Sequence, residues 1–323
     1  MKETSKKAAL LLLTSLLCVV MVECAVRALV PVRNVGPSFS QYDPIYGKSL
    51  KPSSKIRRVT PEFTMWITTD SEGHRGPEQS PKPRGAVLFL GDSFTMGYGV
   101  SDGEEFPALV RDAIAAPVVN MGIGHNGNGR WLVVLRRKAA EYAPSLVVLQ
   151  VHDNDFEDNV AEDWFRLADD GSLVERPIPE PTPRRSLQKA IETLPGVAHL
   201  HLIGLLRQLR LPGGAASEAP ASEASLAEAQ AAAEALTLRL VDEALTETET
   251  RGWPTLVVLA DLQPHRLALL QNLLDRRGVP GVVVPNKDER PDLYYDVDGH
   301  WKPAGHALTV QLLLGTEAIQ AVR

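Results

Sequence analysis

From residue 86 onward, five short apolar runs recur along the chain, and each leads into a polar or glycine-rich turn. They cover residues 86–90, 117–121, 145–151, 254–260 and 281–284. The runs are nearly continuous rather than alternating, which is typical of strands buried on both faces of a parallel sheet. Helical patterns lie between them, at 104–115, 129–142, 265–277 and 303–320. The pattern predicts a doubly wound, three-layer α/β/α sandwich with a mostly parallel sheet of about five strands.

This predicted domain spans residues 85–323 and carries an insertion at about 160–250. Residues 34–84, rich in Pro, Ser, Gly and charge, are interpreted as an N-terminal extension with one candidate strand, "FTMWITT". Within the insertion we expect an irregular acidic stretch at 162–183, an apolar helix at 199–209, a flexible low-complexity loop at 212–225, and a helix that begins at a Ser225–Glu228 capping box.

Residues 1–33 have a basic start and then an almost uncharged run from Ala8 to Val22. Such a segment can span a bilayer, and the positive-inside rule places everything after it on the outer side. A cleaved signal peptide is the alternative, but the small-x-small cleavage signal is poor, so we favour an uncleaved anchor. Glu23 and Arg27 lie one helical turn apart and are expected to pair.

Composition limits the possible chemistry. The formal net charge is -6 and the motif-bearing region has no basic face, which argues against nucleic-acid binding. Both cysteines, Cys18 and Cys24, lie in the N-terminal apolar segment. The rest of the chain therefore has no disulfide framework, no thiol nucleophile and no Cys-ligated metal.

The run 86–90 ends in "GDSFTMGYGV", which places a hydroxyl, Ser93, just beyond a buried strand. A serine at this position often only caps a helix. Two neighbouring strands give it more weight. The second runs into the glycine-rich "NMGIGHNGNG", whose backbone N–H groups can face an oxyanion, and the third ends in "HDND", where Asn154 can donate a side-chain N–H.

A metal site is the alternative interpretation of the third strand's end. Its ligands would be Asp153, Asp155, Glu157 and Asp158. Loops that bind hard cations normally contain a glycine turn, and none is present here. We expect neither a metal nor a cofactor.

A candidate general base for Ser93 lies near the C-terminus, in the segment "YYDVDGHWKPAGH". His300 follows the last strand, with Asp298 two residues and Asp296 four residues before it. A serine needs a base to remove its proton, and the base needs a carboxylate to fix its tautomer. His306 falls inside the last predicted helix and is interpreted as structural.

Taken together, "GDSFTMGYGV", "NMGIGHNG", "HDND" and "DGHW" resemble the motifs of the SGNH (GDSL-like) hydrolase superfamily, in its membrane-anchored bacterial type. The resemblance runs from about residue 85 to the C-terminus, and "ITTDSEGHRGPE" is similar to the extension that precedes the first motif in anchored members.

The resemblance implies a role for each matching residue. Ser93 would be the nucleophile, with Asp92 a structural residue beside it, and His300 would be the base that Asp298 orients. The oxyanion hole would consist of the Ser93 N–H, an N–H of the Gly124 loop and the Asn154 side chain.

The sequence departs from the family's motifs in two places. The glycine of the second motif aligns at or next to His125, which leaves Gly124, His125 and Gly127 as candidate donors, and the family's common Asp-x-x-His spacing would fall on Val297.

These roles imply a serine esterase or deacylase that acts on O-acyl esters, in particular O-acetyl esters, of an extracytoplasmic glycan or lipid. The alternative is a polysaccharide O-acetyltransferase with the same triad, because Asp-x-His-Trp resembles the variant found in such enzymes. A second alternative is a catalytically silent binding protein that works with polysaccharide-assembly proteins. In each case we expect a single-pass protein of the bacterial inner membrane whose large domain faces the periplasm.

Overall fold

The computed structural model describes residues 2–32, 35–79, 81–183, 186, 190, 194, 196–208 and 223–323. The chain divides into two compact units. The first combines Met1–Ser38, Ile56–Thr64 and Pro181–Ser217, and the second combines Phe39–Lys55, Met65–Glu180 and Glu218–Arg323. The low-complexity loop predicted from residue 212 lies almost entirely outside the described residues.

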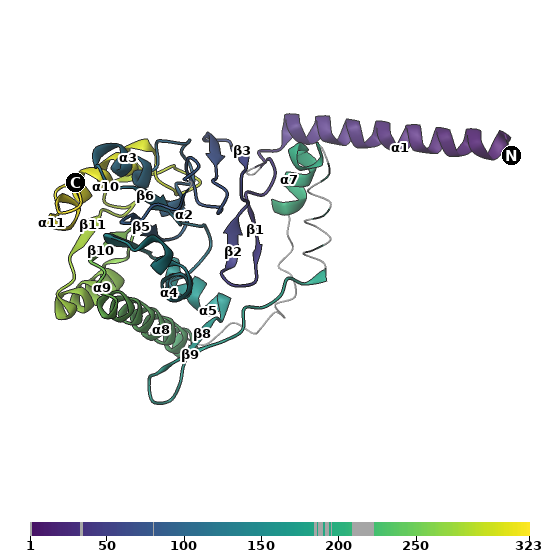
Figure 1. The fold of residues 1–323 in the computed structure, drawn as a ribbon. Helices are drawn as coiled ribbons and strands as arrows, with labels where there is room; N and C mark the ends of the chain where they lie inside the picture. The colour runs from purple at the N-terminus through teal and green to yellow at the C-terminus, as the bar shows by residue number, and fades with distance from the viewer. Residues whose placement is uncertain are drawn as a thin grey trace. The chain divides into compact units, whose positions relative to one another are not determined.

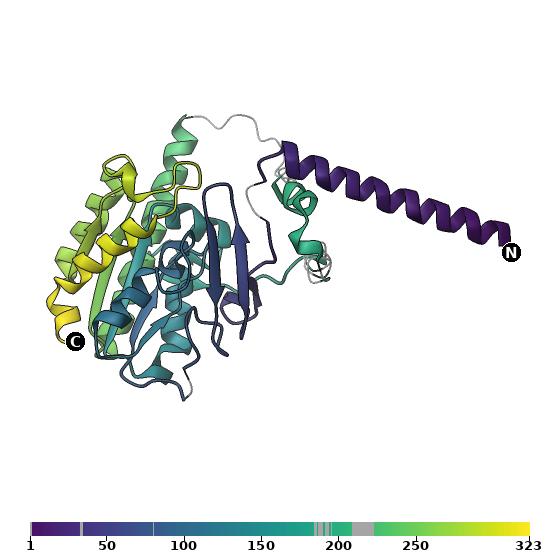
Figure 2. The same ribbon diagram turned by 90° about the horizontal axis from the view of Figure 1, so that it is seen from above.

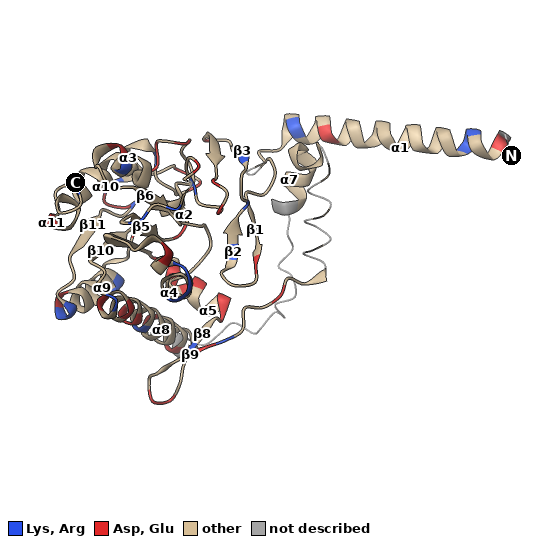
Figure 3. Cartoon of the chain, in the orientation of Figure 1, with Lys and Arg blue, Asp and Glu red and all other residues tan. Residues whose placement is uncertain are grey.

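The first unit is built on α1 (Lys2–Leu29), which runs as one continuous helix (Figures 1 and 2). Charged residues occur only near its two ends (Figure 3), and its Glu3–Leu29 part is long and apolar enough to cross a membrane. Near its C-terminal end, Val26 belongs to a small apolar cluster against which Leu202 and Leu205 of α7 (His201–Gln208) pack. A short 3-10 helix, η2 (Val197–His199), precedes α7.

Glu23 is not paired with Arg27 as the sequence predicted. Its carboxylate instead accepts hydrogen bonds from the backbone N–H groups of His201 (2.8 Å) and Leu202 (2.9 Å). These are first-turn N–H groups of α7, which have no acceptor within their own helix. Glu23 therefore acts as a cap supplied by another helix.

The second unit contains a five-stranded parallel sheet of order β11-β10-β7-β5-β6. Its strands are β5 (Val87–Leu90), β6 (Val118–Asn120), β7 (Leu146–His152), β10 (Thr255–Ala260) and β11 (Gly281–Val284). Each coincides with a predicted run to within a residue or two. The predicted fold class is confirmed.

Helices cover both faces of this sheet (Figure 1). Leu88 of β5 points into an apolar cluster with α4 (Gly129–Arg137), α8 (Glu223–Thr250) and α9 (Pro264–Arg277). The next residue, Phe89, points into the opposite cluster, with α3 (Phe106–Ala113), α10 (Pro303–Leu314) and α11 (Glu317–Gln320). Both side chains are fully buried, which explains why the strand sequence is apolar at successive positions.

The remaining elements are short. They are α2 (Ser93–Met96), α5 (Asp155–Glu162), the 3-10 helices η1 (Ala139–Tyr142) and η3 (Pro291–Leu293), and the strands β1 (Ser40–Asp43), β2 (Gly47–Leu50), β3 (Lys55–Val59), β4 (Thr64–Thr68), β8 (Phe165–Leu167) and β9 (Leu173–Glu175). β1 pairs with β2, and β8 pairs with β9, each as an antiparallel hairpin.

Three local predictions are corrected. The stretch predicted to be irregular contains the β8–β9 hairpin. The helix expected to start at Ser225 begins at Glu223, so Ser225 lies inside α8 and not at its N-cap. The helix predicted over 303–320 breaks at Gly315, where α10 ends.

Candidate active site

The turn after β5 holds Ser93 at the first position of α2. Asp92 is the N-cap, and its Oδ1 accepts a hydrogen bond from the Phe94 N–H at 2.8 Å. The backbone N–H of Asp92 donates to Gln150 Oε1 of β7 at 3.2 Å, which ties the turn to the neighbouring strand. Among residues 91–100, only Ser93 is partly exposed, and the others are buried. The turn therefore exposes the Ser93 hydroxyl to solvent, while the rest of the segment is buried.

His300 lies between Ser93 and Asp298. Its Nε2 is 2.7 Å from Ser93 Oγ, and its Nδ1 is 2.5 Å from Asp298 Oδ1. Asp296, the other candidate carboxylate, is 86% exposed and lies 3.5 Å from Lys302 Nζ. The structure thus brings together the three residues that the sequence singled out, and it places Asp298 at the imidazole.

The loop that carries Asp298 and His300 is braced by its own backbone. The N–H of Tyr295 donates to the His300 carbonyl at 2.8 Å, and Gly299 adopts φ 85°, a conformation that favours glycine. Trp301 is fully buried beneath the site, where its ring packs edge-on against Phe94. A buried anchor next to His300 fixes the base on a short loop.

Two backbone N–H groups beside Ser93 can receive an oxyanion. A Cβ atom on Gly124 would lie 3.2 Å from the Ser93 Cβ, so the Gly124 backbone packs against the nucleophile. Within the described chain, neither the Ser93 N–H nor the Gly124 N–H has an intramolecular acceptor. The Gly127 N–H, in contrast, donates to Glu162 Oε2 at 3.2 Å. Among the donors left open by the sequence, this geometry favours Gly124 over Gly127.

His125 and Lys48 adjoin the same loop. His125 has φ 54°, in the left-handed region that favours glycine. Burial lowers the pKa of His125, and the nearby Lys48 lowers it further. Lys48, from β2, donates its Nζ to the Gly124 carbonyl at 2.6 Å. Sequence reasoning did not find Lys48, because its contact depends on the packing of a distant hairpin.

Asn154 lies at the carboxyl end of β7, as predicted, and its side chain is held at both ends. Its Oδ1 contacts His152 Nδ1, and its Nδ2 donates to Asp158 Oδ2 at 2.7 Å. An amide nitrogen carries two hydrogens, so one remains for a further acceptor. Burial raises the pKa of Asp158, while the hydrogen bond from Asn154 opposes the rise.

The four carboxylates of the alternative metal site point to different partners. Asp153 and Glu157 bind Arg266, at 2.8 and 2.6 Å, and Asp155 is buried, where it accepts from the His152 N–H and Asn128 Nδ2. Asp158 accepts from Asn154. The described residues contain no group of His, Cys, Asp or Glu side chains arranged to hold a metal ion.

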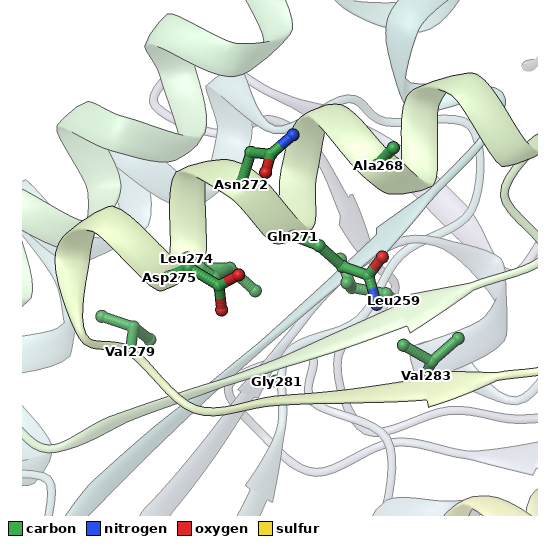
Figure 4. Close-up of a pocket in the computed structure, with 9 residues that line it drawn as sticks. All are labelled: Leu259, Ala268, Gln271, Asn272, Leu274, Asp275, Val279, Gly281 and Val283. Carbon is green, nitrogen blue, oxygen red and sulfur yellow. The ribbon is translucent and has the colours of Figure 1, made fainter.

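The second unit has one cavity at the carboxyl edge of the sheet and another at the side of the sheet. One, of about 390 Å³, has His152, Asn154, Asp261 and Lys287 in its walls and so adjoins the candidate site. The other, of about 340 Å³, is a groove between α9 and the strands β10 and β11 (Figure 4). None of the candidate catalytic residues lines that groove.

Comparisons with known proteins give the following findings. No protein-family model matches the chain, and no curated protein matches it. Solved structures that match include TesA, at 14% identity and TM-score 0.43, over 74% of this chain and 99% of that one. The esterase EstA from Pseudoalteromonas sp. matches at 10% identity and TM-score 0.41, over 73% and 97%. A two-domain esterase active on acetylated mannans matches at 14% identity and TM-score 0.39, over 73% of this chain and 48% of that one.

Proposed function

We propose that the chain is a serine ester hydrolase of the SGNH (GDSL-like) type. The observation that carries the proposal is the hydrogen-bonded series from Ser93 Oγ through the imidazole of His300 to Asp298, with 2.7 Å at one end and 2.5 Å at the other. A serine within reach of an imidazole that a carboxylate orients is the arrangement that activates a hydroxyl for attack on an acyl carbonyl.

In this mechanism Ser93 Oγ attacks the ester carbonyl while His300 Nε2 takes its proton. Asp298 holds Nδ1–H and stabilises the imidazolium that forms. The negative charge on the tetrahedral intermediate is received by the N–H groups of Ser93 and Gly124 and by the remaining N–H of Asn154. His300 then gives its proton to the leaving alcohol, and water, activated by the same base, releases the acid from Ser93.

The N-terminal apolar helix supports a proposal for the substrate class. A helix that can cross a membrane, with Lys2, Lys6 and Lys7 at its N-terminal end, would place the large unit outside the cytoplasm. Esters available there are O-acyl groups of glycans and lipids. We therefore propose that Ser93 removes O-acyl groups, such as acetyl, from an extracytoplasmic glycan or lipid.

The test uses the full-length chain in detergent. A fluorophosphonate probe should label the wild-type chain and p-nitrophenyl acetate should be turned over, while Ser93→Ala should abolish both. Ser101→Ala, at a serine whose Oγ accepts from the Trp66 N–H at 3.3 Å, is the matched control and should react like wild type. A wild-type chain that neither labels nor turns over the ester would refute the proposal.

Acyl transfer to a polysaccharide hydroxyl is the second candidate. It is favoured by one observation: Asp298, two residues before His300 and followed by the buried Trp301, is the carboxylate on the imidazole, as in the Asp-x-His-Trp form. Transfer and hydrolysis share the acyl-enzyme and differ in whether a sugar hydroxyl or water attacks it. Incubation with an acetyl donor and candidate glycans decides between them, since release of acetate without acetylated sugar excludes transfer.

A further inference from the structure

His152 and Asp261 form a second imidazole–carboxylate pair near the nucleophile. In the sheet, His152 of β7 lies opposite Ala260 of β10, so Asp261 follows directly beside it. The two side chains approach to 3.4 Å between His152 Nε2 and Asp261 Oδ2. The other carboxylate oxygen, Oδ1, accepts the backbone N–H of Lys287 at 2.8 Å. The hydrogen bond from the Lys287 backbone thus orients the Asp261 carboxylate toward the imidazole.

The opposite edge of the same imidazole contacts Asn154. His152 Nδ1 lies against Asn154 Oδ1, and the ring stacks on Phe94 with 4.3 Å between centroids. The Asn154 amide is consequently held between a donor at its oxygen and the Asp158 carboxylate at its nitrogen, 2.7 Å away. Rotation of the amide by 180° would exchange these groups and place the oxygen, which cannot donate, where the N–H of the proposed oxyanion hole lies.

We propose that His152, oriented by Asp261, is a positioning residue that keeps the Asn154 amide with its free N–H toward the oxyanion. The inference rests on the proposed function, because only there does Asn154 have an oxyanion to bind. It gives a role to a histidine that sequence reasoning treated merely as part of a polar strand end.

The protonation state of His152 decides how well it can do this. Only an imidazolium carries a proton at Nε2, where it faces Asp261 Oδ2 at 3.4 Å as an ion pair, and a second proton at Nδ1 that can be donated to Asn154 Oδ1. Once Nδ1 loses its proton, it can only accept, and the nearest donor is the backbone N–H of Asn154 at 3.1 Å. The Oδ1 atom then loses its partner, and the hydrogen bond from Nδ2 to Asp158 is the remaining contact that orients the amide.

The charged groups around His152 favour the imidazolium. They come from three elements: Asp261 after β10, Asp92 before α2 and Asp155 at the start of α5. Burial alone would lower the pKa of His152, but Asp261, Asp92 and Asp155 raise it to about 9. The Lys287 side chain, which donates to the carbonyls of Tyr295 and Asp296, also interacts electrostatically with Asp261. These carboxylates therefore favour the doubly protonated imidazole of His152 at neutral pH.

The experiment compares four variants of the full-length chain in p-nitrophenyl acetate hydrolysis between pH 6 and pH 10. His152→Phe keeps a ring against Phe94 but has no donor, and its kcat should fall at least about tenfold with KM nearly unchanged. His152→Gln can still donate to Asn154 Oδ1, and should recover part of kcat without an alkaline loss near pH 9. In Asp261→Asn, that alkaline loss should move to lower pH.

Asp288→Asn is the matched control, because Asp288 lines the same cavity without contacting the pair, and it should keep the wild-type pH profile. A His152→Phe variant with wild-type kcat and an unchanged alkaline limb overturns the inference. Nitrogen NMR of the full-length chain gives a readout that does not depend on turnover. The His152 imidazole should deprotonate near pH 9 in wild type and earlier in Asp261→Asn, and the Asn154 amide signals should shift with it. If the wild-type chain has no esterase activity, the proposed function fails. If the Asn154 amide signals do not shift while His152 titrates, the inference about His152 is overturned.

Discussion

Gly124 packs so closely on Ser93 that a Cβ atom added to it would lie 3.2 Å from the Ser93 Cβ. In Gly124→Ala, either the serine or the loop must move by a few tenths of an ångström. Because the nucleophile and an oxyanion donor are displaced relative to each other, kcat should fall about tenfold to a hundredfold. Esterase kinetics measure this, and the melting temperature should change little, since the conformation at position 124 is open to alanine.

Gly122 gives the contrasting case on the same loop. A Cβ atom there would come within 2.4 Å of the Met96 backbone nitrogen, in the closed interior. Gly122→Ala should therefore lower the melting temperature by several degrees, as a buried steric clash does. If Gly124→Ala proved as destabilising as Gly122→Ala, the loss of activity could not be assigned to the oxyanion hole.

Asp298→Asn tests which carboxylate supports the base. An amide in place of the carboxylate disfavours the tautomer in which His300 Nε2 accepts the proton from Ser93, and it cannot stabilise the imidazolium. In the Ser-His-Asp template, this change lowers kcat by about 10⁴, and we expect a loss of about 10³ to 10⁴ here.

Asp296→Asn is the control for that experiment, because Asp296 is 86% exposed and lies near Lys302 rather than His300. Its kcat should stay within about twofold of wild type, as is usual for an exposed charge with a weak ion pair. Equal losses in the two variants would contradict the assignment of Asp298.

The sheet, and the proximity of Ser93 and His300 at one of its edges, were predictable from the sequence for the same physical reason. Strands buried on both faces must be apolar throughout, and parallel strands bring the residues after their carboxyl ends to one edge. Ser93 and His300 could therefore be placed together although 207 residues separate them. Asp298 was chosen over Asp296 because of the family resemblance, and the loop brings Asp298 rather than Asp296 to His300.

Features that depend on tertiary partners were not predictable. The pattern of α1 shows that Glu23 lies near one end of an apolar helix, but not that α7 docks there. The His152–Asp261 pair depends on the register of β7 against β10, which the two strand sequences do not specify. The β8–β9 hairpin has strands of three residues each, too short for an alternating pattern to be recognised.

Glu23→Ala should loosen α7 without disturbing α1. It removes the acceptor for the N–H groups of His201 and Leu202, and loss of a side-chain cap typically costs about 1 kcal/mol. Hydrogen exchange of the full-length chain should then accelerate about fivefold across residues 201–208. Glu3→Ala, at an exposed residue that pairs with Lys7, is the control and should leave that exchange unchanged. Unchanged exchange in Glu23→Ala would show that apolar packing alone holds α7.

His306 should make the protein sensitive to acid. It is fully buried in α10, where its Nδ1 accepts the Phe106 N–H at 3.3 Å, and burial lowers its pKa to about 3 from an ordinary 6.5. Below pH 6.5 the unfolded chain binds a proton that the folded chain excludes. The free energy of unfolding should thus fall by about 1.4 kcal/mol per pH unit from pH 6.5 toward pH 3 on account of this residue.

In His306→Asn the side-chain oxygen replaces Nδ1 as acceptor and does not titrate. Urea unfolding of both chains at pH 7, 6 and 5 cancels the contribution of other groups, such as His74, and the stability difference between wild type and variant should shift in the variant's favour as the pH falls. A difference that stays constant over this range would mean that His306 is protonated in the folded protein, contrary to its burial.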